Sequence, residues 1–454
     1  MTHTSEEPAF RFVDLFAGIG GFHAALSAYG GECRYAVEID PNAARVYEQN
    51  WGMDPRGDIT ADANDGVMNV PAHDILTAGT PCQPFSKSGA QRGMDETRGT
   101  LWFNTLRIVQ ERKPSVVLIE NVRNLAGPRH KHEWDVIVKA LRQEGYRVAD
   151  QPAIFSPHLL PPALGGRPQV RERVFVTATH NPDAIGNGEP VLPVATMKDR
   201  FQGWGPNDWD LATHLPLDPD HHAAGCDLTK AERLWIDAWD DLVQQLWEAR
   251  EGRKLPGFPI WADHWVTLGD LKIPEGTPDW KRSHLIKNAE FYTEHKRLLD
   301  RWAARWGVYS EKFPPSRRKL EWQAQDTPRL WDCVLHFRPS GIRAKKPSFV
   351  PALVAITQTS IVGPRERRLS PREAARLQSL PEGFDFSGQP NSATYRQLGN
   401  GVNIGVVWHI LRAHVERDRD ILETTDAGRR IIAAVDGAPD SPDKLLNEMF
   451  PVRG

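Results

Sequence analysis

The sequence has few cysteines, and no pair of them is spaced as in a metal or redox site. The four cysteines among the 454 residues are Cys33, Cys82, Cys226 and Cys333. Without a C-x-x-C pair, neither a disulfide framework nor a zinc ribbon is expected. His221, His222 and Cys226 lie near one another, but their spacing matches no common metal site and is more typical of an exposed loop. We therefore expect no bound metal.

Long apolar runs are also missing. No stretch approaches the length of a membrane span, and the N-terminus carries no charged-then-apolar signal. We expect a cytoplasmic protein with no membrane partner. A hydrophobic fraction of 40% and a charged fraction of 25% are typical of globular proteins, and the length is sufficient for more than one domain.

The chain has no excess of basic residues. Its formal net charge is −3, so contacts with nucleic-acid phosphates would have to come from local clusters. Three such clusters are Arg317-Arg318-Lys319, Arg343 with Lys345-Lys346, and Arg365 with Arg367-Arg368. Taken singly, each cluster is more typical of a solvated face or loop than of a DNA contact.

What the sequence does contain is a cysteine in a stiff setting. Cys82 lies within Gly79–Ser86, where prolines flank it, directly after the apolar run Ile75–Ala78 that predicts a short buried strand. A second apolar run, Val116–Ile119, ends in Glu120-Asn121-Val122. Reacting groups in open α/β sheets gather at the carboxyl ends of the strands. The thiol and the carboxyl group are therefore predicted to meet at one edge of a sheet.

A glycine-rich turn near the N-terminus predicts a nucleotide-binding unit. A strand-like run, Phe10–Phe16, leads into Gly18-Ile19-Gly20-Gly21 and then into an apolar helix pattern from Phe22. The spacing G-x-G-G, rather than G-x-G-x-x-G, favours a cofactor without a pyrophosphate. The next predicted strand ends at Glu38, at a distance that suits a carboxylate binding ribose hydroxyls. Asp40-Pro41 is typical of a helix start.

Taken in order, these motifs resemble those of the bacterial DNA cytosine-5 methyltransferases. The resemblance rests on GTPCQPFS and ENV, on the Q-x-R-x-R pattern within Gln169–Phe175, and on the closing motif Gln397–Val402. It runs from about Phe12 to Val407, apart from a long middle stretch. Arg171 and Arg173 alternate with apolar residues, so we predict one strand that presents both arginines on one face.

The resemblance implies the fold class and the reaction. The expected fold is α/β, a Rossmann-like S-adenosylmethionine-dependent methyltransferase sheet with helices on both faces, plus a second, smaller target-recognition domain. The expected reaction transfers a methyl group from S-adenosylmethionine to C5 of cytosine within a specific double-stranded DNA sequence. The base would have to be flipped out of the duplex.

The resemblance also assigns roles to individual residues. Cys82 would add to C6, Glu120 would hold or deliver a proton at N3, and Arg173 would contact O2. Arg171 and Arg173 would raise the thiolate fraction of Cys82 if they lie close to it. The residues assigned to the cofactor are Phe16, Gly18, Gly20, Gly21, Glu38, Asp58, Ile59, Pro81, Asn400 and Val402. For any one of these residues alone, a turn glycine or a strand-end acid without a cofactor role would be the favoured reading. That reading explains the whole set poorly, and the set indicates a cofactor pocket.

Two positions depart from the family pattern. Gly401 follows Asn400 where many members have serine, which leaves only backbone contacts to the cofactor at that position. Thr80 stands where many members have proline, although Pro81 and Cys82 are kept.

The middle stretch carries no family motif and holds twelve of the 16 tryptophans. Two long helical patterns, Leu234–Leu246 and Leu285–Trp306, indicate that most of these aromatics are core. Ser370-Pro371-Arg372-Glu373 is typical of a capping box that begins a helix. The predicted domains are 1–181, catalytic and cofactor-binding; 182–364, target recognition; 365–417, closing motifs returning to the catalytic domain; and 418–454, a C-terminal tail.

Alternatives remain open at this point. The same chemistry would serve an RNA cytosine-5 methyltransferase, and a catalytically silent DNA-binding module is an alternative of another class. A redox role for Cys82 is a weaker reading, since no resolving cysteine is near it in sequence. The recognised DNA sequence, the oligomeric state and the pairing with a cognate restriction endonuclease acting on the same site are not determined by the sequence.

Overall fold

The computed structural model describes residues 7–80, 101–184, 190–196, 204–353 and 359–452. Pro81 and Cys82 lie outside the described residues. The chain divides into two compact units. In terms of described residues, the first comprises 7–209, 351–353 and 374–452, and the second comprises 210–350 and 359–373.

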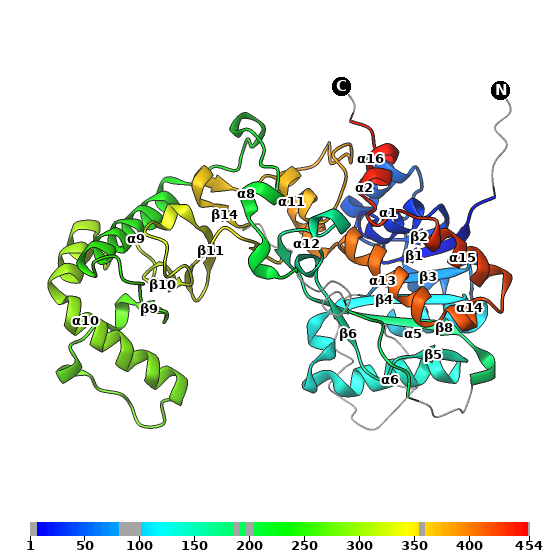
Figure 1. The fold of residues 1–454 in the computed structure, drawn as a ribbon, viewed down its shortest axis with the longest axis horizontal. Coiled ribbons are helices and arrows are strands. Elements are labelled where there is room, and N and C mark those ends of the chain that lie inside the picture. The colour runs from blue at the N-terminus through cyan, green and yellow to red at the C-terminus, as the bar shows by residue number, and fades with distance from the viewer. Residues whose placement is uncertain (1–6, 81–100, 185–189, 197–203, 354–358, 453–454) are drawn as a thin grey trace. The chain divides into compact units, whose positions relative to one another are not determined.

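A seven-stranded mixed sheet forms the centre of the first unit (Figure 1). Its strand order is β2-β1-β3-β4-β8-β5, and β6 also pairs with β8. The strands are β1 (Phe10–Leu15), β2 (Gly31–Val37), β3 (Ile75–Gly79), β4 (Val116–Val122), β5 (Tyr146–Val148), β6 (Ala153–Phe155) and β8 (Arg173–His180). Strands β1, β2, β3 and β4 run parallel to one another. Strand β8 is antiparallel to β4, β5 and β6. The α/β fold class is confirmed.

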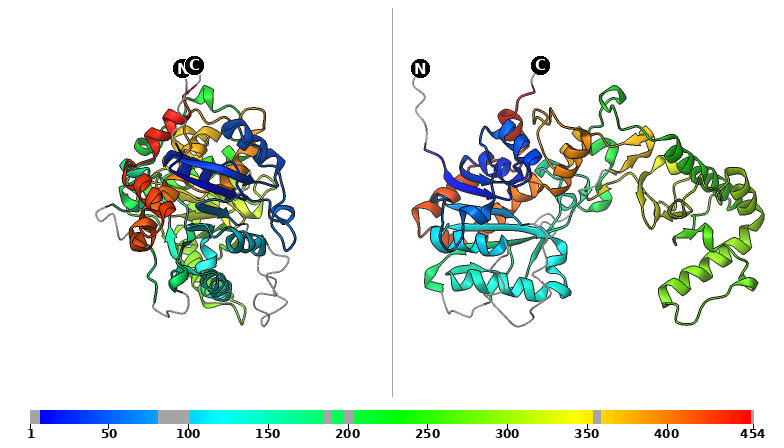
Figure 2. Two further views of the ribbon diagram at one scale, coloured as in Figure 1. Left: turned by 90° about the vertical axis from the view of Figure 1, so that its right-hand side faces the viewer. Right: turned by 180° about the vertical axis from the view of Figure 1, so that it is seen from behind.

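Helices cover both faces of this sheet, as Figures 1 and 2 show. Successive side chains of a strand point to opposite faces. On one face, Phe12 packs edge-on against His23 of α1, whereas Val13 and Leu15 belong to a core shared with α5 and α6. The helices of this unit are α1 (Gly21–Ala28), α2 (Pro41–Trp51), α3 (Ile59–Asp62), α5 (Leu101–Arg112), α6 (Lys131–Gln143), α12 (Asn391–Asn400), α13 (Ile404–Arg417), α14 (Arg419–Leu422), α15 (Asp426–Asp436) and α16 (Asp443–Met449).

Helix α2 begins where the sequence predicts it. The Asp40 carboxylate accepts hydrogen bonds from the backbone N–H groups of Asn42 and Ala43, and Pro41 occupies the first helical position. Gly52 ends the helix with φ 68°, in the left-handed region that glycine adopts without strain. This helix fixes the position of the segment that follows β2.

The second unit contains a six-stranded sheet of order β15-β14-β11-β12-β10-β9. Its strands are β9 (Ile260–Trp261), β10 (Lys319–Trp322), β11 (Val334–Arg338), β12 (Gly341–Lys345), β14 (Ile361–Val362) and β15 (Arg367–Arg368). Its helices are α8 (Leu211–His214), α9 (Lys230–Ala249) and α10 (Asp279–Trp306), and α11 (Pro371–Leu377) begins at its end. Helices α9 and α10 confirm the two predicted helical patterns. The capping box is confirmed too, because Ser370 Oγ accepts the N–H of Glu373 and the Glu373 carboxylate accepts that of Ser370.

Tryptophans form the core of the second unit. Trp239, Trp302 and Trp322 are buried, and the rings of Trp239 and Trp302 lie 4.9 Å apart. The indole N–H of Trp302 donates to the carbonyl oxygen of Ala238 at 2.6 Å. Aromatic residues in this stretch therefore pack mainly inward, as their helical spacing predicts, although Trp280 is 62% exposed.

The two units divide at different positions from those expected at residues 182 and 364. Residues up to 209 belong to the first unit, since the Trp209 indole donates to the carbonyl oxygen of His158 at 2.7 Å. At the other boundary, Arg367 remains in the second unit, where it pairs with Glu373 and donates to the carbonyl oxygen of Asp218. Within the described ranges, no helix is long and apolar enough to span a membrane.

Replacing Trp302 by alanine should destabilise the second unit by about 3–5 kcal/mol, because a large buried ring and its hydrogen bond are lost. Trp280→Ala, in the same helix but exposed, is the matched control and should change stability little. Denaturant unfolding followed by tryptophan fluorescence measures both. Equal effects of the two substitutions would contradict the assignment of Trp302 to the core.

Candidate active site

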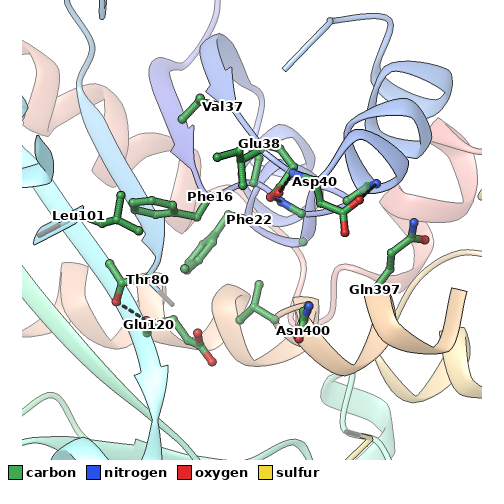
Figure 3. A pocket seen from close by; sticks show the side chains of 18 of the residues that line it. Phe16, Phe22, Val37, Glu38, Asp40, Thr80, Leu101, Glu120, Gln397 and Asn400 are labelled. Carbon is green, nitrogen blue, oxygen red and sulfur yellow. Dashed lines mark hydrogen bonds between the residues drawn. The ribbon is translucent and has the colours of Figure 1, made fainter. Parts of the chain in front are cut away.

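A cavity of about 510 Å³ opens in the first unit at the carboxyl ends of β1, β3 and β4 (Figure 3). Sites for small molecules typically measure roughly 300–1,000 Å³. Its wall is formed by the glycine turn after β1, the segment after β2, the ends of β3 and β4, and the turn after α12. This is the sheet edge at which ligands bind in open α/β folds.

The glycine turn has conformations and contacts that require glycine. Gly18 and Gly20 have φ values of 56° and 91°, and a Cβ at Gly20 would lie 2.2 Å from Nε1 of Trp51. A Cβ at Gly21 would lie 2.7 Å from a side-chain carbon of Val402. The turn is thus packed between α2 on one side and the closing motif on the other.

Glu38 connects two walls of the cavity. One carboxylate oxygen accepts the N–H of Gly18 at 2.8 Å, and the other accepts the N–H of Asp40 at 2.7 Å. The Glu38 side chain lies at the cavity between these two segments (Figure 3). Asp58 also lines the cavity and caps α3, accepting the N–H of Thr60 at 2.9 Å. Both carboxylates are therefore held in place by backbone groups.

Apolar side chains form much of the remaining wall, and the sequence analysis missed most of them. Phe22, Val37, Ile39 and Leu101 line the cavity together with the predicted Phe16. Ile39 is 74% exposed, although it lies just beyond the buried end of β2. The sequence did contain a signal for Ile39. It lies between two acidic residues at a strand end, a position where a large apolar residue has no evident core partner and could line a site.

The ends of β3 and β4 are joined by side-chain hydrogen bonds. Gly79 lies opposite Glu120 in the parallel register, and Thr80 Oγ1 donates to the carbonyl oxygen of Glu120 at 3.3 Å. The amide nitrogen of Asn121 donates to Thr80 Oγ1 at 2.9 Å. Thr80, one of the departures from the family pattern, therefore ties the segment leading into Cys82 to the ENV strand.

Glu120 and Arg173 form a buried ion pair at the base of the cavity. Arg173 Nε lies 2.8 Å from a carboxylate oxygen of Glu120, which is 8% exposed. Burial raises the pKa of Glu120 above its ordinary value, and the charges of Arg173 and Arg171 oppose this shift without cancelling it. Within the described part of the chain, Nη2 of Arg173 has no hydrogen-bond partner. A carboxyl group able to hold a proton and a guanidinium group thus lie together at the cavity.

The prediction that one continuous strand presents Arg171 and Arg173 on the same face was wrong. Strand β7 covers Gln169–Val170 and β8 begins at Arg173, so Arg171 lies in the break between them. Its guanidinium is buried and donates to the carbonyl oxygens of Leu353, Gly399 and Gly401, at 2.6–2.9 Å. A buried charge needs such acceptors, which draws Arg171 away from the strand. In this structure Arg171 anchors the turn after α12.

Most of the predicted site residues meet at this one cavity. The predicted cofactor residues that line it are Phe16, Gly18, Gly21, Glu38, Asp58, Ile59, Asn400 and Val402, and the predicted catalytic residues that line it are Glu120 and Arg173. Gly20 is not among the lining residues and instead contacts Trp51. The predictions for Pro81 and Cys82 lie outside the described residues.

Comparisons with known proteins identify one family. A family model described as C-5 cytosine-specific DNA methylase matches residues 10–416. The chain is 53% identical over 513 residues to the type II methyltransferase M.AluI of Cellulosimicrobium cellulans, covering 97% of this chain and 98% of that protein. It is 44% identical over 402 residues to the type II methyltransferase M.HhaI of Haemophilus parahaemolyticus, covering 88% and 92%. Among solved structures, that of S. pombe Dnmt2 methyltransferase matches with a TM-score of 0.46 and 19% identity, covering 90% of this chain and 98% of that one.

The raised pKa of Glu120 predicts a pH-dependent difference in stability between the wild type and Glu120→Gln. Because the folded state favours the protonated carboxyl group, the stability that Glu120 contributes is full below its ordinary pKa of 4.5. It is lost as the pH rises through the raised pKa of the folded protein. The free energy of unfolding of the wild type minus that of the variant should therefore fall as the pH rises.

Urea unfolding at a series of pH values measures this difference. Glu111→Gln, which removes a carboxyl group from the exposed side of α5, is the control. A difference that grows with pH would show that the ion pair with Arg173 outweighs burial.

Proposed function

The chain belongs to the C-5 cytosine-specific DNA methylase family, and from this premise we propose that it methylates cytosine within one specific sequence of double-stranded DNA. It is a DNA (cytosine-5-)-methyltransferase and its substrate is DNA. The observation that carries the proposal is the single cavity that holds both the Glu38 carboxylate and the Glu120–Arg173 pair. One cavity of this kind suits a reaction between a nucleoside cofactor and a base.

Members of this family use S-adenosylmethionine, which supplies an electrophilic methyl group when bound. The residues around the cavity fit this molecule. Glu38 offers carboxylate oxygens to ribose hydroxyls, and Asp58 offers an acceptor to the adenine amine. Phe16 and Ile39 supply apolar surface for the purine ring. Gly18, without a side chain, lets the backbone approach the ligand closely.

The mechanism we propose overcomes the low nucleophilicity of C5 in an aromatic ring. The Cys82 thiolate adds to C6 while N3 takes up a proton, and the enamine that results has a nucleophilic C5. Glu120 supplies that proton, for which a raised pKa suits it. Nη2 of Arg173 donates to the base oxygen O2. After methylation of C5, a base takes the C5 proton, and the electrons of that bond re-form the C5–C6 double bond and expel the Cys82 thiolate. The N3 proton returns to Glu120, which restores the aromatic ring.

Arg171 has a different role in this proposal from the one that the sequence predicts. Within the described residues its guanidinium donates to three backbone carbonyls, so Arg171 acts first by fixing the turn Gly399–Gly401 beside the cofactor. Its charge lowers the energy of Glu120 in the ionised form. Any increase that Arg171 causes in the thiolate fraction of Cys82 would come from its charge alone, and this effect stays a prediction.

We assign recognition of the DNA sequence to the second unit, because its residues carry no motif of the reaction. Not all of its basic residues are free for phosphates. Arg367 is buried against Glu373, and Arg343 pairs with Glu321 at 2.5 Å. Contacts with the DNA backbone would therefore fall to exposed members of the clusters, such as Arg365. Extrusion of the target base costs a few kcal/mol.

We further propose that the enzyme belongs to a type II restriction-modification system in the cytoplasm, with a cognate restriction endonuclease acting on the same site. The names of its relatives support this assignment. Bisulfite sequencing of DNA from a host that expresses the enzyme tests the activity and reports the recognised sequence. Unconverted cytosines at one recurring sequence are expected; complete conversion would contradict DNA methylation and leave the RNA enzyme or the silent DNA-binding module.

Replacing Cys82 by serine should abolish a covalent complex with DNA that carries 5-fluorocytosine at the recognised position. Fluorine replaces the proton that has to leave C5, so methyl transfer proceeds but elimination does not, and the enzyme stays bonded to C6. Serine is far less ionised at neutral pH and should not add. Glu120→Gln should form the complex more slowly, because an amide cannot supply the N3 proton.

A denaturing gel of enzyme, cofactor and modified DNA measures this complex. Cys33→Ser is the matched control and should still form it. If the wild type methylates ordinary DNA but gives no Cys82-dependent shifted band, the covalent mechanism is wrong for this enzyme.

Replacing Glu38 by alanine should weaken S-adenosylmethionine binding at least about 10-fold, because hydrogen bonds to a charged group are lost and the Gly18 turn loses its acceptor. Glu38→Gln, which keeps one oxygen acceptor, should lose less. Calorimetric titration gives both affinities, with Glu111→Ala on the exposed side of α5 as the control. A folded Glu38→Ala protein with unchanged affinity would remove Glu38 from the cofactor site.

A further inference from the structure

The C-terminal segment after α13 carries no motif and lies beyond the family match, which ends at residue 416. It nevertheless forms α14, α15 and α16 and packs on the first unit. Figures 1 and 2 show α16 beside α1 and α2. The segment therefore reaches α1, which begins at the glycine turn, and α2, whose last residue contacts that turn.

Trp51, the last residue of α2, supports that turn from the side away from the cavity. Its indole N–H donates to the carbonyl oxygen of Ile19 at 3.1 Å. The indole also lies directly against Gly20, where a Cβ would come within 2.2 Å of its nitrogen. The Trp51 ring also stacks on the His23 ring of α1, with the two centroids 4.0 Å apart. The position of Trp51 thus sets the position of the turn.

Phe450, just after α16, packs edge-on against Trp51. The ring centroids lie 5.0 Å apart at an interplanar angle of 88°. The Phe450 ring also contacts Phe384, which is buried and itself lies 6.2 Å from the Trp51 ring. The fit is tight at the backbone too, since a Cβ at Gly383 would lie 2.2 Å from the carbonyl oxygen of Phe450. Edge-to-face contacts of this kind favour one orientation of the rings.

The helix before Phe450 is anchored at its start. Asp443, the first residue of α16, accepts a hydrogen bond from Arg167 at 2.6 Å, and Pro442 lies against Gly165. Leu446 of the same helix is buried. Phe450 is therefore held against Trp51 by a fixed element.

We propose that Phe450 is a positioning residue for the cofactor pocket and acts through Trp51 on the turn Gly18–Gly21. The inference rests on the proposed binding of S-adenosylmethionine in this cavity. The turn carries the Gly18 N–H that binds Glu38 at 2.8 Å, so a shift of Trp51 moves a hydrogen-bonded part of the pocket wall. A pocket that is held in its binding conformation before the ligand arrives binds more tightly. The C-terminal segment thus helps to hold the pocket in its binding conformation without contacting the ligand.

The test is the affinity of full-length Phe450→Ala for S-adenosylmethionine, measured by calorimetry. We expect the dissociation constant to rise about 3- to 10-fold, the size typical of a lost aromatic contact. The KM for S-adenosylmethionine should rise with it, while kcat at saturating cofactor and the KM for DNA stay unchanged. Phe450→Tyr, which keeps the ring, should restore the affinity. Met449→Ala, at the neighbouring exposed position, is the matched control.

A second measurement separates action through Trp51 from a general loss of stability. In a Trp51→Leu background, Phe450→Ala should weaken cofactor binding no further, because the residue through which it acts is gone. An equal loss with and without Trp51 would overturn the proposal, as would unchanged affinity in folded Phe450→Ala. If Phe450→Ala does not fold, Phe450→Leu, which keeps apolar bulk without a ring, takes its place. Failure of the wild type to bind S-adenosylmethionine would instead contradict the proposed function.

Discussion

The site depends on the register of β4, which pairs with β3 on one side and with β8 on the other. In the parallel ladder Gly79 lies opposite Glu120, so the segment that leads to Cys82 emerges beside the carboxyl group. In the antiparallel ladder Val122 lies opposite Arg173, which makes Glu120 and Arg173 diagonal neighbours on one face. A slip of one residue in β4 would turn Glu120 to the other face of the sheet. The two ladders, rather than the surrounding loops, bring the acid and the guanidinium together.

Local patterns explain which parts of this arrangement could be predicted from the sequence. The first strand, the glycine turn and α1 follow from apolar periodicity and glycine spacing, and α2 follows from the Asp40-Pro41 start. The edge that carries Glu120 follows from the strand that precedes it. Arg171 could not be placed in this way. Its partners Leu353, Gly399 and Gly401 are about 180 to 230 positions away, and a buried guanidinium goes where carbonyl acceptors are available.

Only some of the residues that line the cofactor side of the cavity could be predicted from the sequence. Glu38 was found because an acidic residue at a strand end stands out among apolar neighbours, and Asp58 was found because it matches the family pattern. Ile39 and Phe22 were missed, since an apolar residue beside a strand is assigned to the core unless its exposure is known. The unit boundaries were displaced for a similar reason. Trp209 and Arg367 are fixed by partners that lie far away in the sequence, His158 and Asp218 respectively.

The glycine turn explains why so many distant segments converge on the cofactor side. Phe16, Gly18 and Gly20 all have positive φ values, and for a bulky residue such as Phe16 this costs on the order of 1 kcal/mol or more. Such a conformation persists only where the surroundings enforce it. Here the Glu38 carboxylate accepts the N–H of Gly18 on the cavity side of the turn. On the opposite side, the Trp51 indole donates to the carbonyl oxygen of Ile19. Because the turn is held from both sides, the shape of the pocket depends on the packing behind Trp51 as much as on the residues that face the ligand.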